Sequence, residues 1–285
     1  MSDPHRDLAL DKTFTLGAEI TAEQHAFLDQ YGFLVFKGVA SQLEVDTIMS
    51  EADRIGKQWL AAGRKQVNGI PLFVGRGIDG EPFVQRLAFS STFSEYIRNF
   101  VRDDRFAPIR TLIGDNTRVG DREKDGVVIN RYVKVPGSVY PRLGWHTDGL
   151  RDLFYGRMPK QMLNVGLHFD KICLEDGGLR LIPGTHTQGF RDMCFRKRYF
   201  VDHRPDPTEF AVETEPGDLT IHDGRLWHRV QESPHTGERS LRRSMYVPYL
   251  TDPYEPKHEG SKTPFYHHLG SAMRKVQVAA SRVRG

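Results

Sequence analysis

The sequence predicts an α+β protein in which helices come first and a sheet or barrel follows. Apolar residues recur at helical spacing in roughly the first 125 residues, whereas short β-rich runs separated by Gly and Pro begin at Val127. Helices followed by a run of strands are typical of an α+β protein with a segregated sheet. The chain has 285 residues, which suits one large domain with a sizeable core.

The first elements have clear boundary signals. Residues 1–20 form a lead-in that we expect to be poorly ordered. Thr21 and Gln24 make a capping box at the start of the first helix, and Gly32 is expected to end it because glycine tolerates the left-handed cap. Residues 33–36 follow as a short apolar run, which predicts a buried strand.

Two further helical stretches precede the β-rich part. One begins at Ser41 and is expected to end at Gly63, with apolar residues at helical spacing in between. A third is expected over about residues 93–112. Its apolar stripe consists of Tyr96, Ile97, Phe100 and Val101.

The strands of the second part are expected over residues 127–135, 163–169, 179–182, 219–222 and 244–250. No spacer rich in Pro and Ser lies near residue 125, so we expect the helices to buttress the sheet within one domain. The sequence thus predicts a flexible segment over residues 1–20 and a single domain over 21–285. Within this domain we expect a helical buttress over about 21–125, a barrel over about 126–250 and a lid or tail over about 251–285.

Composition excludes several classes of protein. The formal net charge is +3, from 40 basic and 37 acidic residues, which is too even to indicate a nucleic-acid or membrane surface. The two cysteines, Cys173 and Cys194, make neither a disulfide framework nor a zinc knuckle and fit a reducing compartment. No apolar stretch resembles a signal peptide or approaches the roughly 20 residues of a membrane span. We therefore expect a cytoplasmic protein.

A candidate metal site dominates the β-rich part. His146 and Asp148 are separated by one residue, so on a strand their side chains share a face. A second histidine, His228, follows about eighty residues later in Trp227-His228. Two imidazoles and one carboxylate, without thiolates, are the facial triad that binds Fe(II) and leaves open positions. The spacing alone leaves His186 and His222 as competitors of His228.

A basic stretch follows the second histidine. If residues 242–246 form the last strand, Arg242, Ser244 and Tyr246 share a face. A guanidinium can grip a carboxylate with two parallel hydrogen bonds, and a nearby hydroxyl can add a third. Such a group would hold the distal carboxylate of 2-oxoglutarate. The alternative interpretation is an exposed edge strand whose like charges repel other chains.

Together these residues resemble the phytanoyl-CoA dioxygenase family of Fe(II)/2-oxoglutarate-dependent oxygenases. The resemblance covers most of the chain and depends on the combination of its motifs. It rests on residues 27–39, 133–138, 145–148, 175–186, 216–219, 224–228 and 242–244.

The resemblance implies a double-stranded β-helix, a jelly-roll or cupin-like barrel, with the N-terminal helices packed outside. It implies iron held by His146, Asp148 and His228, and 2-oxoglutarate and dioxygen as co-substrates. The co-substrate arginine would be Arg242, followed by Ser244, although the spacing from His228 keeps Arg239 as an alternative. Asn130, on the strand before the iron motif, and Asn164, on the strand after it, are expected as further 2-oxoglutarate contacts. The presence of Asp148 argues against a halogenase, since related halogenases replace this carboxylate with a small residue.

The implied activity is hydroxylation of an unactivated C–H bond in a small-molecule metabolite, with release of succinate and carbon dioxide. The same chemistry can give desaturation, cyclisation or epimerisation, and a cupin-like hydrolase, isomerase or ligand-binding protein is the alternative from another class. We expect residues 149–161 and the insert over residues 188–215 to line the mouth of the site, and residues 251–269 to form a lid. Substrate contacts are predicted for Arg151, Arg157 and Arg180. We expect neither nucleic acid nor membrane as a partner, and the sequence leaves the oligomeric state open.

Overall fold

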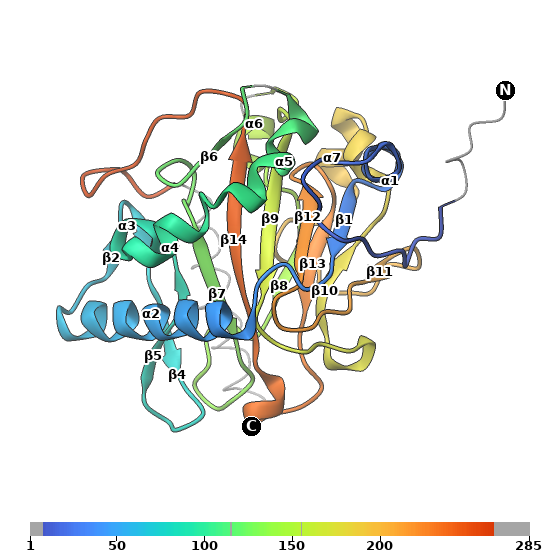
Figure 1. Ribbon diagram of the computed structural model, residues 1–285. Coiled ribbons are helices and arrows are strands. Elements are labelled where there is room, and N and C mark those ends of the chain that lie inside the picture. The colour runs from blue at the N-terminus through green and yellow to red at the C-terminus, as the bar shows by residue number, and fades with distance from the viewer. Residues whose placement is uncertain (1–7, 115, 155, 265–285) are drawn as a thin grey trace, which may run out of the picture.

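Two antiparallel sheets form the core of the protein. The computed structural model describes residues 8–114, 116–154 and 156–264. The larger sheet has eight strands in the order β1-β12-β9-β14-β7-β5-β4, with β6 also paired to β14 (Figure 1). The smaller sheet has four strands in the order β11-β10-β13-β8. This arrangement is a jelly-roll β-sandwich, so the predicted double-stranded β-helix is confirmed.

The strands of the larger sheet are β1 (Phe33–Phe36), β4 (Phe73–Arg76), β5 (Pro82–Leu87), β6 (Arg118–Val119), β7 (Val128–Tyr132), β9 (Met162–His168), β12 (Leu219–Asp223) and β14 (Arg242–Leu250). Those of the smaller sheet are β8 (Leu143–His146), β10 (Gly178–Leu181), β11 (Phe210–Ala211) and β13 (His228–Gln231). A separate hairpin joins β2 (Gln66–Val67) and β3 (Ile70–Pro71). The strand predicted over residues 33–36 and the five predicted in the second part of the chain therefore each correspond to one observed strand.

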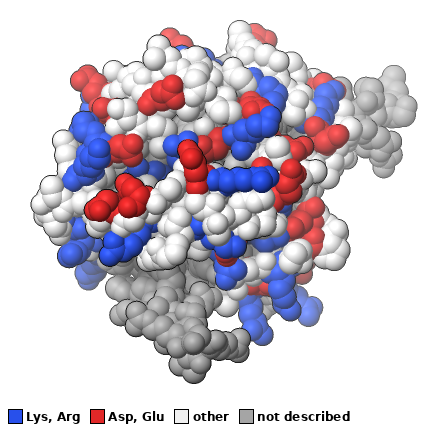
Figure 2. Space-filling view, turned by 90° about the horizontal axis from the view of Figure 1, so that it is seen from below, with Lys and Arg blue, Asp and Glu red and all other residues white. Residues whose placement is uncertain are grey.

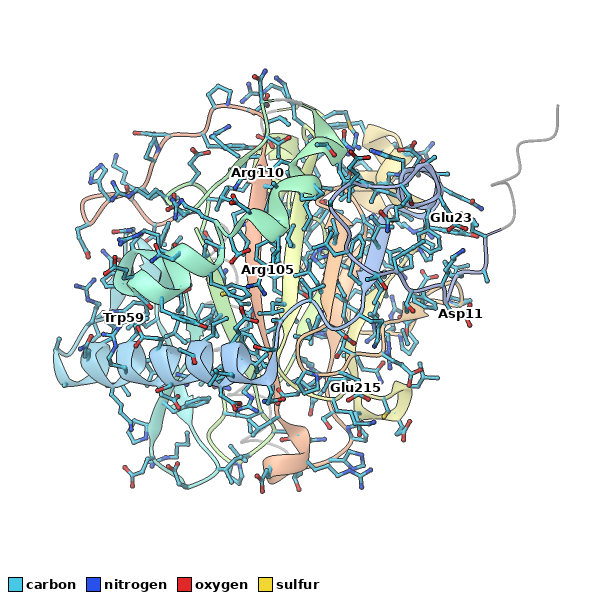
Figure 3. The ribbon with its side chains drawn as sticks, viewed as in Figure 1. Asp11, Glu23, Trp59, Arg105, Arg110 and Glu215 are labelled. Carbon is cyan, nitrogen blue, oxygen red and sulfur yellow. The ribbon has the colours of Figure 1, made fainter. Side chains whose placement is uncertain are left out.

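The first two helices begin where the sequence predicts. In α1 (Ala22–Tyr31) the capping box of Thr21 and Gln24 is present, and Gly32 adopts the left-handed conformation at its end. A second capping box, made by Ser41 and Glu44, starts α2 (Gln42–Ala61). Arg105, which is labelled in Figure 3, links this first turn to a later part of the chain, because its guanidinium donates to Glu44 at 2.7 Å. One capping box thus stabilises the first turn of each of these two helices.

The third helical stretch is broken, so the prediction of one helix over residues 93–112 is wrong. Ser94 accepts from the amide of Ile97 and Asp103 from that of Arg105, so each side chain starts a new turn. Tyr96 is 37% exposed, although the other members of the predicted stripe are buried. The segment consists of α3 (Ser90–Phe93), α4 (Glu95–Phe100), η1 (Asp104–Phe106), α5 (Ala107–Arg110) and η2 (Thr111–Ile113).

The region expected to be only a helical buttress also contributes strands. The β4–β5 hairpin extends the larger sheet, because β5 pairs with β7 through Arg86 opposite Asn130. The predicted flexible lead-in is likewise packed in part: Phe14 is buried and pairs with Phe36 in parallel. Burial of an aromatic ring offsets the entropy of ordering this segment.

Helices cover one side of the larger sheet, where α2, α4 and α5 lie in front of β7 and β14 (Figure 1). Trp59 of α2 is buried there against Phe93 (Figure 3). The other short helices are α6 (Leu150–Phe154), η3 (Leu174–Asp176), η4 (Thr185–Thr187), α7 (Phe190–Phe195) and η5 (Gly237–Ser240). Within the described ranges, no helix combines the length and apolar composition needed to cross a bilayer.

The charged surface is mixed in sign. Viewed from below, basic and acidic side chains alternate over the exposed face (Figure 2), which agrees with the nearly balanced composition. Of the C-terminal stretch expected as a lid, residues 251–264 are described and residues 265–269 lie outside the described residues.

Candidate metal centre

Two neighbouring strands of the smaller sheet supply the histidines. His146 is the last residue of β8 and His228 the first of β13, and the two are paired directly across the strands. Asp148 lies two residues beyond the end of β8, so the expectation that it shares a strand with His146 is corrected. Its backbone amide donates to the carbonyl of Gly224 at 2.8 Å, which anchors the chain after it leaves the sheet.

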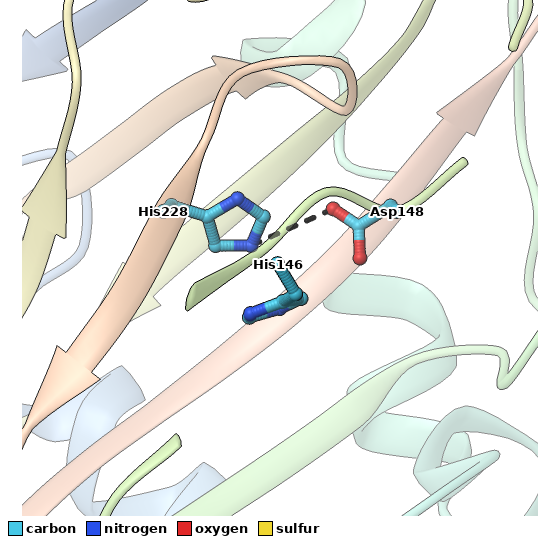
Figure 4. Close-up of side chains that lie close together, drawn as sticks. All are labelled: His146, Asp148 and His228. Atoms are coloured by element: carbon cyan, nitrogen blue, oxygen red, sulfur yellow. Dashed lines mark ion pairs between the residues drawn. The ribbon is translucent and has the colours of Figure 1, made fainter. Parts of the chain in front are cut away.

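The three side chains converge on one point (Figure 4). One ligand atom from each of His146, Asp148 and His228 lies within 4.8 Å of the other two. The two imidazole rings have centroids 4.0 Å apart, and His228 Nε2 lies 3.6 Å from Asp148 Oδ2. Among the described residues, these three are the His, Cys, Asp or Glu side chains that lie close enough together to hold a metal ion.

Both histidines are fixed in the tautomer that a metal requires. His146 Nδ1 lies 2.9 Å from the carbonyl of Gly144, and His228 Nδ1 lies 2.9 Å from the carbonyl of Leu226. A carbonyl only accepts, so each Nδ1 carries the proton and each Nε2 keeps its lone pair. Metal-bound histidines in proteins are oriented in this way. Two imidazoles and one carboxylate therefore fit a divalent metal such as Fe(II).

Electrostatics keep the ligands in their binding forms. Burial, followed by the effect of His228, lowers the pKa of His146 to about 3. Burial alone would raise the pKa of Asp148, but His228, His146 and Lys124 outweigh it and lower that pKa to about 2. A neutral imidazole beside an ionised carboxylate is the state that coordinates a cation.

The competing histidines do not join this group. His186 lies against the end of α1, where its Nε2 is 3.2 Å from the carbonyl of Asp29. His222 is nearer, since its ring centroid is 4.5 Å from that of His228. Its Nε2, however, faces the side-chain amide of Asn164 at 3.2 Å. The structure thus brings His228 to the His-x-Asp motif and leaves the other two outside the triad.

Arg242 lies inside the barrel. It begins β14, which pairs with β7 on one side and β9 on the other, so the alternative of an exposed edge strand does not hold. Its side chain is buried above Tyr132, and its guanidinium donates to the carbonyls of Gln231 and, at 2.6 Å, Pro141. Burial lowers the pKa of Arg242 to about 10. Arg239 lies on the exposed turn η5.

No carboxylate of the described residues lies within ion-pair distance of Arg242. Ser244 shares its face of β14 and lies opposite Asn130, whose buried Oδ1 has no hydrogen-bond partner within the described part of the chain. Asn164, the other residue expected to contact 2-oxoglutarate, donates from its side-chain amide to Asp148 Oδ2.

Sequence reasoning missed Arg86. It lies on β5 opposite Asn130, with a side chain only 14% exposed. Its Nη2 donates to Asp125 at 2.7 Å, whereas its buried Nη1 has no hydrogen-bond partner in the residues that the structure describes. Its charge also contributes to the lowered pKa of His146. No motif in the sequence marks this arginine, and only the pairing of β5 with β7 brings it to the site.

The predicted substrate arginines are dispersed. Arg180 is paired with Arg229 in the smaller sheet, next to the pair formed by Leu181 and the ligand His228. Because neighbouring residues of a strand point to opposite faces, Arg180 points away from the ligands. Its side chain donates to Gln231 instead. This corrects its predicted role. Arg157 is exposed just after α6, and Arg151 lies within α6.

The insert, residues 188–215, reaches the ligands instead through the part that precedes β11. The ring centroid of Phe200 lies 5.1 Å from that of His146. Tyr199 shares a 2.7 Å hydrogen bond with Thr147. This contact agrees with the expectation that residues 188–215 line the mouth of the site.

A groove of about 610 Å³ lies elsewhere, between α2 and the beginning of β14. Two of its charged residues, Asp53 and Arg243, are paired with Arg131 and Asp170. The groove is separate from the triad and contributes nothing to it.

Several solved structures share this fold. AviO1 from Streptomyces viridochromogenes Tue57 is 16% identical with a TM-score of 0.57, over 86% of this chain and 100% of that one. The epimerase SnoN, crystallised with Fe3+, alpha ketoglutarate and nogalamycin RO, is 18% identical with a TM-score of 0.56, over 83% and 85%. EctD from S. alaskensis with bound Fe is 17% identical with a TM-score of 0.59, over 86% and 82%.

These likenesses show the fold. No curated protein matches the chain in sequence. The family model described as Phytanoyl-CoA dioxygenase (PhyH) matches residues 28–235, which is more than half of the chain and includes all three candidate ligands. The chain therefore belongs to the phytanoyl-CoA dioxygenase family of Fe(II)/2-oxoglutarate-dependent oxygenases.

Proposed function

We propose that His146, Asp148 and His228 hold Fe(II) in this protein, and that it hydroxylates an unactivated C–H bond of a small-molecule metabolite. The observation that carries the proposal is the convergence of three ligand atoms within 4.8 Å, with both histidines fixed as Nδ1–H tautomers. The three ligands leave other coordination positions open for co-substrates.

When bound, the iron supplies, with 2-oxoglutarate and dioxygen, the oxidising chemistry that forms succinate and carbon dioxide and functionalises the substrate. The residues of the chain position the reactants. Arg242 and Ser244 bind the distal carboxylate of 2-oxoglutarate, because a buried cation that has no ion-pair partner among the described residues favours an anion. Asn130 adds a polar contact through its unpartnered amide oxygen.

The substrate enters beside His146. The ring of Phe200 lies beside that of His146, with the ring centroids 5.1 Å apart. Since a half-buried aromatic ring offers an apolar face, we propose that the part of the substrate nearest the metal is apolar. The free cysteines Cys173 and Cys194 fit a reducing compartment, and we propose a cytoplasmic location.

Related chemistry has other outcomes. Similar structures include proteins described as an epimerase and as a carbocyclase from nogalamycin biosynthesis. Epimerisation, cyclisation or desaturation is therefore the second candidate outcome for this chain. A cupin-like hydrolase is less consistent with the structure, because hydrolysis does not require the buried Arg242.

The test begins without a substrate. Fe(II) and 2-oxoglutarate are added to the protein under anaerobic conditions, and the visible spectrum is recorded. We expect a weak charge-transfer band, lost in Arg242→Ala and retained in Arg239→Ala, whose parent residue is exposed on a turn. Succinate should form when air is admitted. Absence of both the band and succinate would overturn the proposal.

A further inference from the structure

Asn164 connects the iron ligands to the larger sheet. It lies on β9, and its side-chain nitrogen donates to Asp148 Oδ2. The same nitrogen lies 3.2 Å from His222 Nε2, on the neighbouring strand β12. His222 is directly opposite Asn164 in the pairing of the two strands. A side-chain amide has two N–H groups, so one Asn164 can serve both acceptors.

This arrangement fixes the roles of the three side chains. A carboxylate only accepts, so the amide nitrogen and not its oxygen must face Asp148. The second N–H then points at His222, whose Nε2 must be unprotonated to accept it. The ring of His222 is buried, with its centroid 4.5 Å from that of His228 and 5.9 Å from that of Tyr246. Packing therefore fixes the ring of His222, and the hydrogen bond to this ring fixes the side-chain amide of Asn164.

Asp148 needs such support more than the histidines do. His146 and His228 are residues of paired strands, and backbone carbonyls fix both rings. Asp148 lies beyond the end of β8, and its side chain is 28% exposed. Its backbone is anchored by Gly224. The hydrogen bond from Asn164 is the contact that orients its carboxylate toward His228.

We propose that Asn164 and His222 act as a pair of positioning residues, which hold the Asp148 carboxylate in the orientation that binds iron. The inference rests on the proposed iron site and assigns Asn164 a role other than binding 2-oxoglutarate. Residues that orient metal ligands typically change metal affinity by about 10–100-fold when they are replaced. Asn164 acts directly on Asp148, whereas His222 acts through Asn164.

Metal binding to the whole protein tests this pair without any turnover. Co(II) is titrated anaerobically into the metal-free protein, and its visible absorption reports both affinity and ligand geometry. Asn164→Leu keeps the volume and removes both donors. We expect it to weaken Co(II) binding by about 10–100-fold and to change the shape of the absorption band. If this variant does not fold, Asn164→Ala is measured in its place.

His222 supplies the sharper comparison. His222→Phe keeps a ring but loses the acceptor, and we expect weaker Co(II) binding, whereas His222→Gln keeps an acceptor and should restore part of the affinity. In the Asn164→Leu background, His222→Phe should have no further effect, because the two residues act in series. His168→Phe is the matched control, since His168 is a buried histidine of the same sheet that contacts Thr220 instead.

The outcomes separate the inference from the proposed function. Wild-type Co(II) affinity and band shape in Asn164→Leu, with binding lost in Asp148→Ala, would overturn the role of the pair while leaving the metal site intact. Additive effects of the two substitutions would overturn the serial arrangement. Failure of the wild-type protein to bind either Co(II) or Fe(II) would instead overturn the proposed function.

Discussion

Two buried polar atoms without hydrogen-bond partners among the described residues belong to neighbouring strands of the larger sheet. They are Arg86 Nη1 on β5 and Asn130 Oδ1 on β7, and the two residues are paired in the sheet. Leaving a buried donor or acceptor unsatisfied costs about 1–3 kcal/mol, and more for a charged group. A bound molecule with oxygen atoms would remove this cost. The row continues to Ser244, opposite Asn130, which places the pair beside the proposed 2-oxoglutarate site.

Arg86 should therefore contribute to co-substrate binding. We expect Arg86→Ala to raise the dissociation constant for 2-oxoglutarate about 10-fold or more, because hydrogen bonds to charged groups contribute about 1.5–3 kcal/mol. Binding is measured by titrating 2-oxoglutarate into the anaerobic Fe(II) protein. Asp125→Asn is the control, since it weakens the ion pair of Arg86 but keeps the guanidinium. Equal dissociation constants in Arg86→Ala and the wild type would contradict the assignment.

Residue-level prediction succeeded where a motif exists. The His-x-Asp spacing and the later Trp-His pair identified the three residues that converge in space. Arg86 carries no such signal, because an isolated arginine in a polar run is ordinarily on the surface. The bond from Asn164 to Asp148 also depends on how β9 packs against the loop after β8, which no local pattern reveals.

Elements were predictable where their signals are local. Both capping boxes lie within four residues of chain, so the starts of α1 and α2 were predicted correctly. The β4–β5 hairpin was missed, because its place in the sheet depends on pairing with β7, more than forty residues later. The edge contact of the insert with β8 is similarly non-local: Phe200 donates its backbone amide to the carbonyl of Trp145 at 2.8 Å.

Gly144 permits this edge contact. A Cβ atom at position 144 would lie 2.5 Å from the backbone oxygen of Phe200, and backbone cannot move aside as a flexible side chain can. We expect Gly144→Ala to displace the insert from β8 and to increase the rate of tryptic cleavage at Arg196 or Arg198 several-fold. Both arginines are exposed. Cleavage is followed by mass spectrometry of the native protein at short digestion times.

Gly189→Ala provides the control for this element. A Cβ at position 189 meets nothing within 4 Å, so the substitution should leave the cleavage rate unchanged. Unaltered cleavage in Gly144→Ala would show that the insert is held by other contacts. The hydrogen bond between Tyr199 and Thr147 would then be the first one to examine.

Burial of several histidines makes the stability of the whole molecule sensitive to acid. Burial lowers the pKa of His146 to about 3 and that of His168 to about 4, and it lowers the pKa of His222 well below its ordinary value of 6.5. The folded protein keeps these rings neutral, whereas the unfolded chain binds protons below pH 6.5. Stability therefore rises with pH through this range and is lost as the pH falls.

We expect the free energy of unfolding of the metal-free protein to fall steeply between pH 6 and pH 4.5. Each of the three histidines contributes up to about 1.4 kcal/mol for each pH unit in this window. The quantity to measure is the urea midpoint as a function of pH, with a chelator present. His168→Gln keeps a partner for Thr220 but does not titrate, so it should reduce the slope by about a third. An unchanged slope in this variant would mean that His168 is protonated in the folded state.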